Sequence, residues 1–282
     1  MDKRTQPQFI TLQDGRSLSY SSYGPAHGKP VFIFHGIPGS RLEHADLSVL
    51  EQIPTRLITM DRPGHGQSDF MEDRQLLDWP DDVSQLADSL SIDKFTVMGF
   101  SGGGSYAAAC AYKIPHRLNR VVLLSSTAPF EIPGLTENIP ADNRALFELA
   151  AQDYQLAAEQ VAGLVDQPEA ILGMFEAVAS NSDKQVLQNQ KFRAMYLKNI
   201  SEACRQEMTG VTYDMSIAAS PWGFDVADID MDIELWHGLD DATVPVAMAN
   251  YLAESIPNCH ARLIPGKGHF LMFEQWAEVL KG

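Results

Sequence analysis

The stretch VMGFSGGGSYAAA (Val97–Ala109) decides how the rest of the chain is interpreted. It places Ser101 between glycines, where an apolar run typical of a buried strand gives way to an alanine-rich run typical of a helix. The letters GFSGG, which begin at Gly99, fit the pattern G-x-S-x-G, in which a nucleophilic serine lies on a sharp strand-to-helix turn. Small neighbours are needed there because bulky side chains would clash in the strained turn. The same stretch also contains a glycine pattern of phosphate-binding loops, so two interpretations have to be compared.

The phosphate-binding interpretation rests on residues 102–107, which fit G-x-G-x-x-A after a predicted strand. A dinucleotide fold also requires an acidic residue about 20 positions further on, at the end of the next strand, to hold the ribose. The next apolar run ends in SST at 125–127, and no acidic residue follows before Glu131. No lysine follows the glycines, as a P-loop would require. The sequence therefore favours a serine nucleophile over a nucleotide site.

Short apolar runs alternate with helical patterns on both sides of this turn. A hairpin is predicted around the turn Asp14-Gly15. Strands buried on both faces are predicted at 31–34, 56–60, 94–98 and 120–124, and further strands are predicted at 232–236 and 261–264. Helices are expected in between, one with Pro80 in its first turn and the last over 273–280. This alternation predicts an α/β fold with a doubly wound, mainly parallel sheet.

The alternation stops near Thr127, and from about 142 to 216 the composition is helical, with no strand pattern. We therefore expect a core domain of residues 1–129 and 222–282 and an inserted helical cap of residues 130–221. Because ligands of open α/β sheets bind at the carboxyl ends of the strands, the cap would cover Ser101 as a lid. Some bulky apolar residues of the cap should face the cleft, and the candidates are Leu146, Phe147, Leu149, Tyr154, Met174, Phe175, Met195 and Tyr196.

A serine nucleophile needs a base, and the base needs an orienting acid, in the chain order Ser, Asp, His. Among the eight histidines, position in the chain selects His269, because GKGHF follows the last predicted strand. Asp240 and Asp241 both follow the penultimate strand, within HGLDDATVP, and both are candidates for the acid.

Acyl transfer also requires two N–H donors for the oxyanion. The first is expected to be the N–H of Gly102, directly after the nucleophile. The second is expected from the loop FIFHGIPGS, at 32–40. Pro38 in this loop has no N–H, so Ile37 is the predicted donor. This chemistry implies no cofactor and no metal ion.

Composition limits the partners and the setting of the protein. A formal net charge of −16 argues against nucleic acid or an anionic membrane surface as the main partner. The sequence has no run of eighteen apolar residues, and its polar start lacks the apolar segment of a signal peptide. Cys110, Cys204 and Cys259 are widely spaced and indicate neither a disulfide framework nor a zinc site. We therefore expect a cytoplasmic protein, with no signal for a particular oligomeric state.

In their order and spacing, the motifs HGIPGSR, DRPGHGQSD, GFSGGG, HGLDDATVP and GKGHF resemble those of the α/β-hydrolase superfamily. The resemblance is closest to the esterase-like branch with a helical cap, and it extends from about Phe9 to Leu280. It aligns the acid of this family with Asp241. It also implies that DRPGHGQSD is a structural turn.

The resemblance implies a serine hydrolase that acts on small-molecule carboxylic esters, with small to medium acyl groups, through an acyl-enzyme on Ser101. Epoxide hydrolases and haloalkane dehalogenases are disfavoured because they carry an aspartate at this position. Proline iminopeptidases are less favoured because they carry a glycine in place of Ile37 and a tryptophan in place of Gly102. Lactonases and carbon–carbon bond hydrolases share the triad and stay as alternatives, as do a lyase and a ligand-binding receptor of the same fold without turnover.

Overall fold

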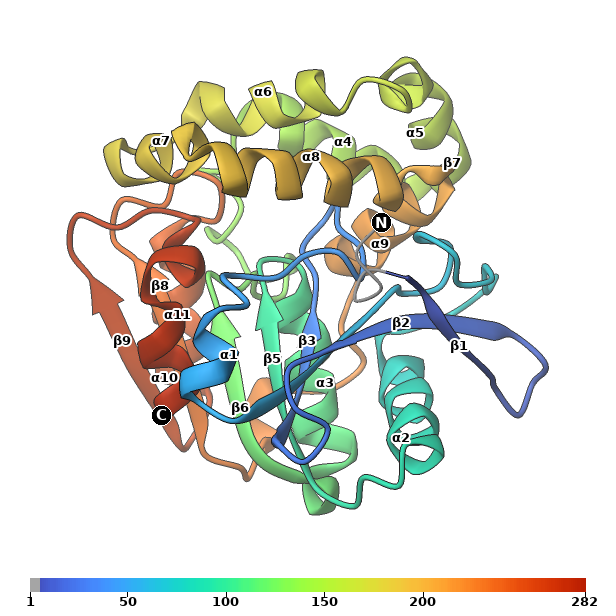
Figure 1. The fold of residues 1–282 in the computed structure, drawn as a ribbon. Helices are drawn as coiled ribbons and strands as arrows, with labels where there is room; N and C mark the ends of the chain where they lie inside the picture. Colours follow the sequence, from blue (N-terminus) through green and yellow to red (C-terminus); the bar gives the residue numbers. More distant parts are fainter. Residues whose placement is uncertain (1–5) are drawn as a thin grey trace.

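A sheet of eight strands forms the centre of the molecule (Figure 1). The structure is a computed structural model that describes residues 6–282. In sheet order the strands are β1 (Gln8–Thr11), β2 (Ser17–Tyr23), β4 (Thr55–Met60), β3 (Lys29–Phe34), β5 (Phe95–Phe100), β6 (Leu118–Leu124), β8 (Ile233–Gly238) and β9 (Cys259–Ile264). β2 is antiparallel to both β1 and β4, and all other neighbours are parallel. The mainly parallel sheet that the sequence predicts is confirmed.

Helices cover both faces of this sheet. Those on one face are α2 (Trp79–Ser89), α3 (Gly103–Lys113) and α10 (Val246–Ser255), and those on the other are α1 (Val49–Gln52) and α11 (Leu271–Lys281). Along β5 the side chains of Phe95 and Val97 pack on the first face, and those of Met98 and Phe100 pack on the second. Because successive side chains of a strand alternate between faces, a strand buried on both sides is apolar throughout.

The predicted elements lie where the sequence indicates them. Each predicted strand is present, with ends shifted by no more than about two residues. β9, at the edge of the sheet, has no fully buried residue. Pro80 lies in the first turn of α2, where its missing N–H leaves no helix bond unmade. The last helix is longer than predicted, because it begins at Leu271 and ends at Lys281.

Between β6 and β8 the chain forms a block of helices that stands over the carboxyl ends of the parallel strands (Figure 1). Its members are α4 (Ala141–Gln152), α5 (Tyr154–Val161), α6 (Pro168–Val178), α7 (Asn181–Gln188), α8 (Gln190–Ala203) and α9 (Thr209–Ala219). We call residues 141–219 the helical insertion. Within it, α4 and α5 pack against α9, and α6 and α7 pack against α8. That this segment is a separate cap domain stays a prediction.

One short strand in the helical insertion is not predicted by the sequence. β7 (Arg205–Met208) links α8 to α9 and is not part of the central sheet. Gln206 on this strand donates from Nε2 to the carbonyls of Gly66, at 3.0 Å, and Ser68, at 2.7 Å. Polar contacts to a turn of the core accompany this extended segment, which is why no apolar run marks it in the sequence.

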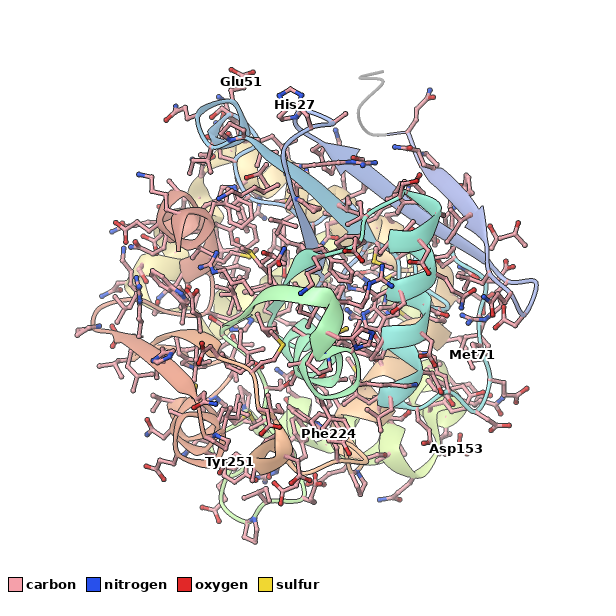
Figure 2. The ribbon with its side chains drawn as sticks, turned by 90° about the horizontal axis from the view of Figure 1, so that it is seen from below. His27, Glu51, Met71, Asp153, Phe224 and Tyr251 are labelled. Carbon is pink, nitrogen blue, oxygen red and sulfur yellow. The ribbon has the colours of Figure 1, made fainter. Side chains whose placement is uncertain are left out.

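The opposite end of the molecule, away from the helical insertion, is seen in Figure 2. The side chains of His27, Glu51 and Tyr251 lie at its rim, around the sheet and its covering helices. Among residues 6–282, no helix has both the length and the apolar composition needed to cross a bilayer.

Candidate active site

Ser101 lies on the turn that joins β5 to α3. Its φ is +54°, in the left-handed region that residues other than glycine rarely adopt. Three backbone hydrogen bonds hold this conformation: the N–H of Ser101 donates to the carbonyl of Leu124 at 2.9 Å, and its own carbonyl accepts from Gly104 at 3.0 Å and from Thr127 at 3.3 Å. A strained residue that its surroundings hold in place is a common feature of functional sites.

The glycines around Ser101 are required by close backbone packing. A Cβ on Gly99 would lie 2.2 Å from the carbonyl oxygen of Gly103, and a Cβ on Gly103 would lie 2.2 Å from the carbonyl oxygen of Phe34. Both distances are too short for any side chain to fit beside a rigid backbone. The G-x-S-x-G pattern therefore lets β5, β3 and the start of α3 meet at the turn.

The loop after β3 lies against this turn. A Cβ on Gly36 would lie 3.3 Å from the Cβ of Ser101. Gly36 is fixed through its carbonyl, which accepts from Arg62 Nη2 at 2.9 Å. In a trans peptide the N–H points opposite to the carbonyl, so the N–H of Ile37 points away from Arg62. Among residues 6–282, the N–H groups of Ile37 and Gly102 have no hydrogen-bond acceptor, and both residues line the same cavity as Ser101.

His269 and Asp241 are joined by a hydrogen bond of 2.9 Å between Nδ1 and Oδ2. The other oxygen of Asp241 accepts from the N–H groups of Thr243, at 2.9 Å, and Val244, at 2.8 Å. Burial lowers the pKa of His269, but the charge of Asp241 and its hydrogen bond outweigh burial and raise this pKa above 6.5. Asp240, the other candidate acid, has an exposed side chain.

A hydrogen bond from the core fixes the loop that carries His269 at the carbonyl of this residue. Ser125 Oγ, at the end of β6, donates to the carbonyl of His269 at 2.8 Å. The imidazole packs on Phe100, with 5.0 Å between the ring centres. Phe100 directly precedes Ser101, so the structure brings His269, Asp241 and the serine turn to one end of the sheet.

Asp183 on α7 is a contact of this loop that the sequence did not indicate. Its Oδ2 accepts from the N–H of His269 at 3.0 Å, and its Oδ1 accepts from the N–H of Phe270 at 2.8 Å. The same carboxylate completes a capping box with Ser180 at the start of α7. The pattern S-x-x-D at 180–183 predicts a helix start, but no local signal predicts that this carboxylate reaches a loop of the core.

The motif DRPGHGQSD is more than a turn. Arg62 Nε lies 2.6 Å from Asp214 Oδ2, on α9 of the helical insertion, and Arg74 pairs with the same carboxylate. Burial raises the pKa of Asp214, but the charges of Arg62 and Arg74 hold it well below its usual value. His65 Nε2 also lies 2.9 Å from Asp214. Arg62 therefore connects the loop after β3 to the helical insertion.

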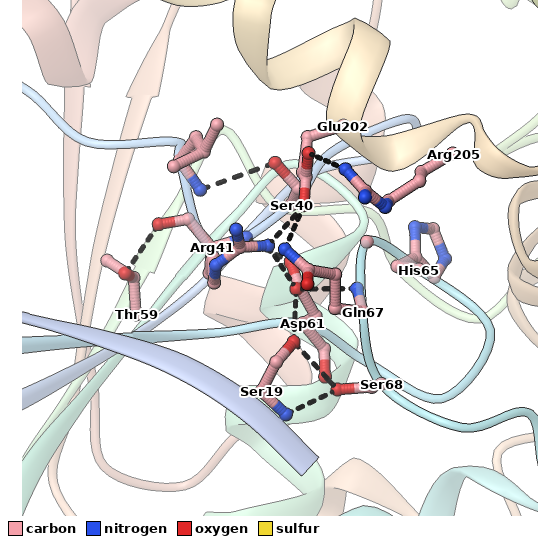
Figure 3. Close-up of polar contacts among 12 residues, drawn as sticks. Ser19, Ser40, Arg41, Thr59, Asp61, His65, Gln67, Ser68, Glu202 and Arg205 are labelled. Carbon is pink, nitrogen blue, oxygen red and sulfur yellow. Dashed lines mark hydrogen bonds and ion pairs between the residues drawn. The ribbon is translucent and has the colours of Figure 1, made fainter. Parts of the chain in front are cut away.

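A second polar cluster holds the far end of the same loop (Figure 3). Arg41 Nη1 lies 2.6 Å from Asp61 Oδ2 and 2.6 Å from Glu202 Oε1, which belongs to α8. Gln67 Nε2 donates to the same oxygen of Glu202 at 3.1 Å. The loop is thus fixed to the core and to the helical insertion at once.

A cavity of about 110 Å³ lies between Ser101 and the helical insertion. Its polar lining residues are Ser101, Thr127, Asn143 and Thr243. Of the bulky residues that the sequence singled out, Leu146, Phe147, Met174 and Phe175 line it, whereas Leu149, Tyr154, Met195 and Tyr196 do not.

No Asp, Glu, Lys or Arg is among the described residues that line this cavity. An anionic group of a ligand would therefore be buried without an opposite charge at the wall. In the described part of the chain, no group of three His, Cys, Asp or Glu side chains is arranged to hold a metal ion.

Comparison with known proteins matches residues 29–275 to a family described as alpha/beta hydrolase fold. A putative 2-succinyl-6-hydroxy-2,4-cyclohexadiene-1-carboxylate synthase of Bacillus subtilis is 26% identical, over 94% of this chain and 93% of its own. A non-heme chloroperoxidase of Streptomyces lividans is 27% identical, over 93% of each chain. A bifunctional esterase/perhydrolase of Acinetobacter calcoaceticus is 25% identical, over 93% of this chain and 92% of its own.

Solved structures share the fold over almost the whole chain. A bromoperoxidase from Bacillus anthracis superposes with a TM-score of 0.73, at 23% identity, over 98% of both chains. A thermophilic esterase from Thermogutta terrifontis gives 0.69, at 23% identity, over 98% of this chain and 96% of its own. An enol-lactonase from Burkholderia xenovorans gives 0.72, at 18% identity, over 97% of both chains. At these identities the likeness shows the fold alone.

Proposed function

Because the chain belongs to the α/β-hydrolase fold family, by its match over residues 29–275, we propose that it hydrolyses carboxylic esters with small to medium acyl groups. Membership of this family supports a hydrolase activity; the ester substrate and the residues that act on it are our proposal. The observation that carries the proposal is the hydrogen bond of 2.9 Å between His269 and Asp241, at the end of the sheet where Ser101 lines an apolar cavity.

In the proposed reaction, His269 takes the proton of Ser101 while Ser101 Oγ attacks the ester carbonyl. Asp241 keeps the proton of the imidazole on Nδ1, so that Nε2 is free to act as the base. The unpaired N–H groups of Ile37 and Gly102 stabilise the oxyanion. His269 then protonates the leaving alcohol, and a water molecule, activated in the same way, releases the acyl group from Ser101.

The cavity supports the choice of substrate. Its volume of about 110 Å³ is well below the roughly 300–1,000 Å³ of sites that hold drug-sized ligands. Its walls are mostly apolar and carry no charge, so an uncharged acyl group fits better than one with a carboxylate. We propose that residues 130–221 form a cap domain over the core of 1–129 and 222–282 and set the limit on acyl size.

Hydrolysis of p-nitrophenyl butyrate tests the proposal. The purified protein should show multiple turnovers, and Ser101→Ala should lower kcat on the order of 10³-fold or more, because a triad acts as a unit. An organophosphate should add its mass at Ser101. Ser84→Ala, in α2, serves as the control and should keep full activity. An active Ser101→Ala variant would refute the mechanism, and a single acylation without turnover would favour a receptor.

A further inference from the structure

A second carboxylate, Glu43, lies behind the loop that carries Ile37. Glu43 is fully buried. Glu43 Oε1 accepts from the N–H of Gly36 at 3.0 Å, and Oε2 accepts from Asn199 Nδ2 at 3.0 Å. Burial raises the pKa of this carboxyl to about 7. Among residues 6–282, no lysine, arginine or histidine lies within ion-pair distance of Glu43. Its direct polar contacts are these two N–H donors, and the more distant charges of Arg62 and His269 favour the carboxylate.

Asn199, on α8, is also fully buried and has one possible orientation. Its Oδ1 accepts from the backbone N–H of Ser40 at 2.8 Å and from Ser40 Oγ at 2.8 Å. Because a backbone N–H only donates, the oxygen of the amide must face Ser40 and the nitrogen must face Glu43. One turn further along α8, Glu202 pairs with Arg41 (Figure 3). The same face of α8 thus contacts the loop at Ser40 and at Arg41.

These contacts act on one residue of the loop from two sides. Gly36 is held at its N–H by Glu43, at 3.0 Å, and at its carbonyl by Arg62, at 2.9 Å. The peptide that follows Gly36 carries the N–H of Ile37, so fixing Gly36 at both ends fixes the direction of that N–H. A displacement of about 1 Å at such a donor costs a reaction on the order of 100-fold.

We propose that Glu43 and Asn199 are positioning residues that fix the oxyanion donor Ile37 and tie it to helix α8 of the helical insertion. This inference rests on the proposed ester hydrolysis for its effect on rate. The hydrogen-bond pattern has a definite polarity: Glu43 accepts twice, and Asn199 donates to it while it accepts from Ser40. Any change that places two donors or two acceptors face to face should loosen the loop.

The polarity can be broken and restored with nearly isosteric variants. Glu43→Gln leaves one of its two donors, the N–H of Gly36 or Asn199 Nδ2, facing an amide N–H₂. Asn199→Asp removes the N–H donor to Glu43 and places two carboxyl groups against each other. Combining the two substitutions restores one donor and one acceptor at this contact, keeps an acceptor for Gly36 and for Ser40, and keeps the total charge. A surface change of the same kind, Asn119→Asp, is the control because its side chain is exposed.

Two measurements on these variants and the wild type test the inference. Each single variant should lower kcat for p-nitrophenyl butyrate by about 10- to 100-fold, with KM changed by less than about 3-fold, and should weaken an alkyl trifluoromethyl ketone in parallel. The double variant should recover kcat to within about 3-fold of the wild type. Hydrogen exchange of the amides at 35–41 should be faster in both single variants and normal in the double variant.

The two measurements separate the two proposals. Single variants with wild-type kcat and wild-type exchange, or a double variant that rescues neither, would overturn the positioning role. A wild-type protein without esterase activity, combined with rescued exchange in the double variant, would refute the ester hydrolysis. The inference that Glu43 and Asn199 fix the loop with Ile37 would then still stand. If a single variant does not fold, Ser40→Ala is measured in the same way against the wild type. It removes the hydroxyl that contacts the side chain and carbonyl of Asn199 and accepts from the N–H of Leu42, and it should lower kcat and speed exchange in the same direction.

Discussion

The carboxylate of Asp183 accepts a hydrogen bond of 3.0 Å from the backbone N–H of His269. The acceptor belongs to helix α7 of the helical insertion, and the donor belongs to the loop that follows β9 in the core. The helical insertion is therefore bonded directly to the loop that carries the proposed base, as well as to the loop that carries a proposed oxyanion donor.

Asp183→Asn should impair activity as well as stability. The amide nitrogen cannot accept, so the N–H of either His269 or Phe270 is left buried without an acceptor, which costs about 1–3 kcal/mol of stability. We expect kcat for p-nitrophenyl butyrate to fall by about 10-fold or more because the imidazole shifts. Asp153→Asn is the matched control, since Asp153 caps α5 at an exposed position. Equal kcat in the two variants would show that Asp183 only caps its helix.

The paired aspartates should differ sharply in their effect on rate. In Asp241→Asn the oxygen is expected to stay with the N–H groups of Thr243 and Val244, so the amide nitrogen faces His269 Nδ1 and forces the proton onto Nε2. The base then has the wrong tautomer, and kcat should fall on the order of 10⁴-fold. Asp240→Asn changes an exposed side chain and should keep kcat within about 3-fold. The reverse order of effects would reassign the acid to Asp240.

The pH dependence of the rate follows from the raised pKa of His269. Only the neutral imidazole accepts a proton, so kcat/KM should rise with pH through a pKa above 6.5. In Asp241→Asn the raising charge is lost while burial remains, so the limb of the residual activity should move to lower pH. A profile of kcat/KM from about pH 5 to 9 measures the position of this limb in the wild type and in Asp241→Asn. An unchanged limb in Asp241→Asn would contradict the assignment of this pKa to the pair.

The same pKa makes a prediction for stability. A base with a raised pKa in the folded state binds more protons than in the unfolded state. The stability that it contributes is therefore fully present below pH 6.5 and is lost as pH rises through the pKa of folded His269. The buried carboxyl of Glu43, whose pKa is raised from 4.5 to about 7, also makes the folded protein less stable as pH rises through this interval. The free energy of unfolding of the wild type and of Glu43→Gln, measured with urea at several pH values, should separate the contribution of His269 from that of Glu43.

Acyl chain length should show a maximum at short to medium esters. Each methylene buried in the cavity adds at most about 0.8 kcal/mol to binding of the transition state until the cavity of about 110 Å³ is full. A series of p-nitrophenyl esters measures kcat/KM along the chain length, and emulsified long-chain triglyceride should be a poor substrate. Phe147→Ala enlarges the cavity and should move the maximum to longer chains. A rate jump at the oil–water interface would indicate a lipase instead.

The serine turn could be predicted from the sequence because its causes are local. Gly99 and Gly103 are demanded by backbone contacts within a few residues of Ser101 or to the neighbouring strand, so the pattern is written in one short stretch. The central strands β3, β4, β5 and β6 could be predicted for a similar reason, since burial on both faces makes most of their residues apolar.

The contacts of the helical insertion with the core could not be predicted in this way. Asp183, Asn199 and Glu202 lie on helices whose polar residues are expected to face solvent. The packing of α7 and α8 over the core buries Asp183 and Asn199 and partly covers Glu202. Periodicity also left open which bulky residues meet the cavity. Phe147 and Tyr154 both belong to apolar stripes, but only Phe147 lines the cavity, because the ring of Tyr154 packs instead against Phe70 and Tyr213.

The position of the helical insertion between two neighbouring strands also has a consequence for how the chain assembles. Val121 of β6 pairs with Ile233 of β8, roughly 110 residues later in the chain. Closing a flexible loop of that length costs about 2 kcal/mol more entropy than closing a loop of about 10 residues. Helices that form first shorten the effective loop, so we expect the strands that precede Asp241 and His269 to join the sheet late, after the block above the cavity has begun to order.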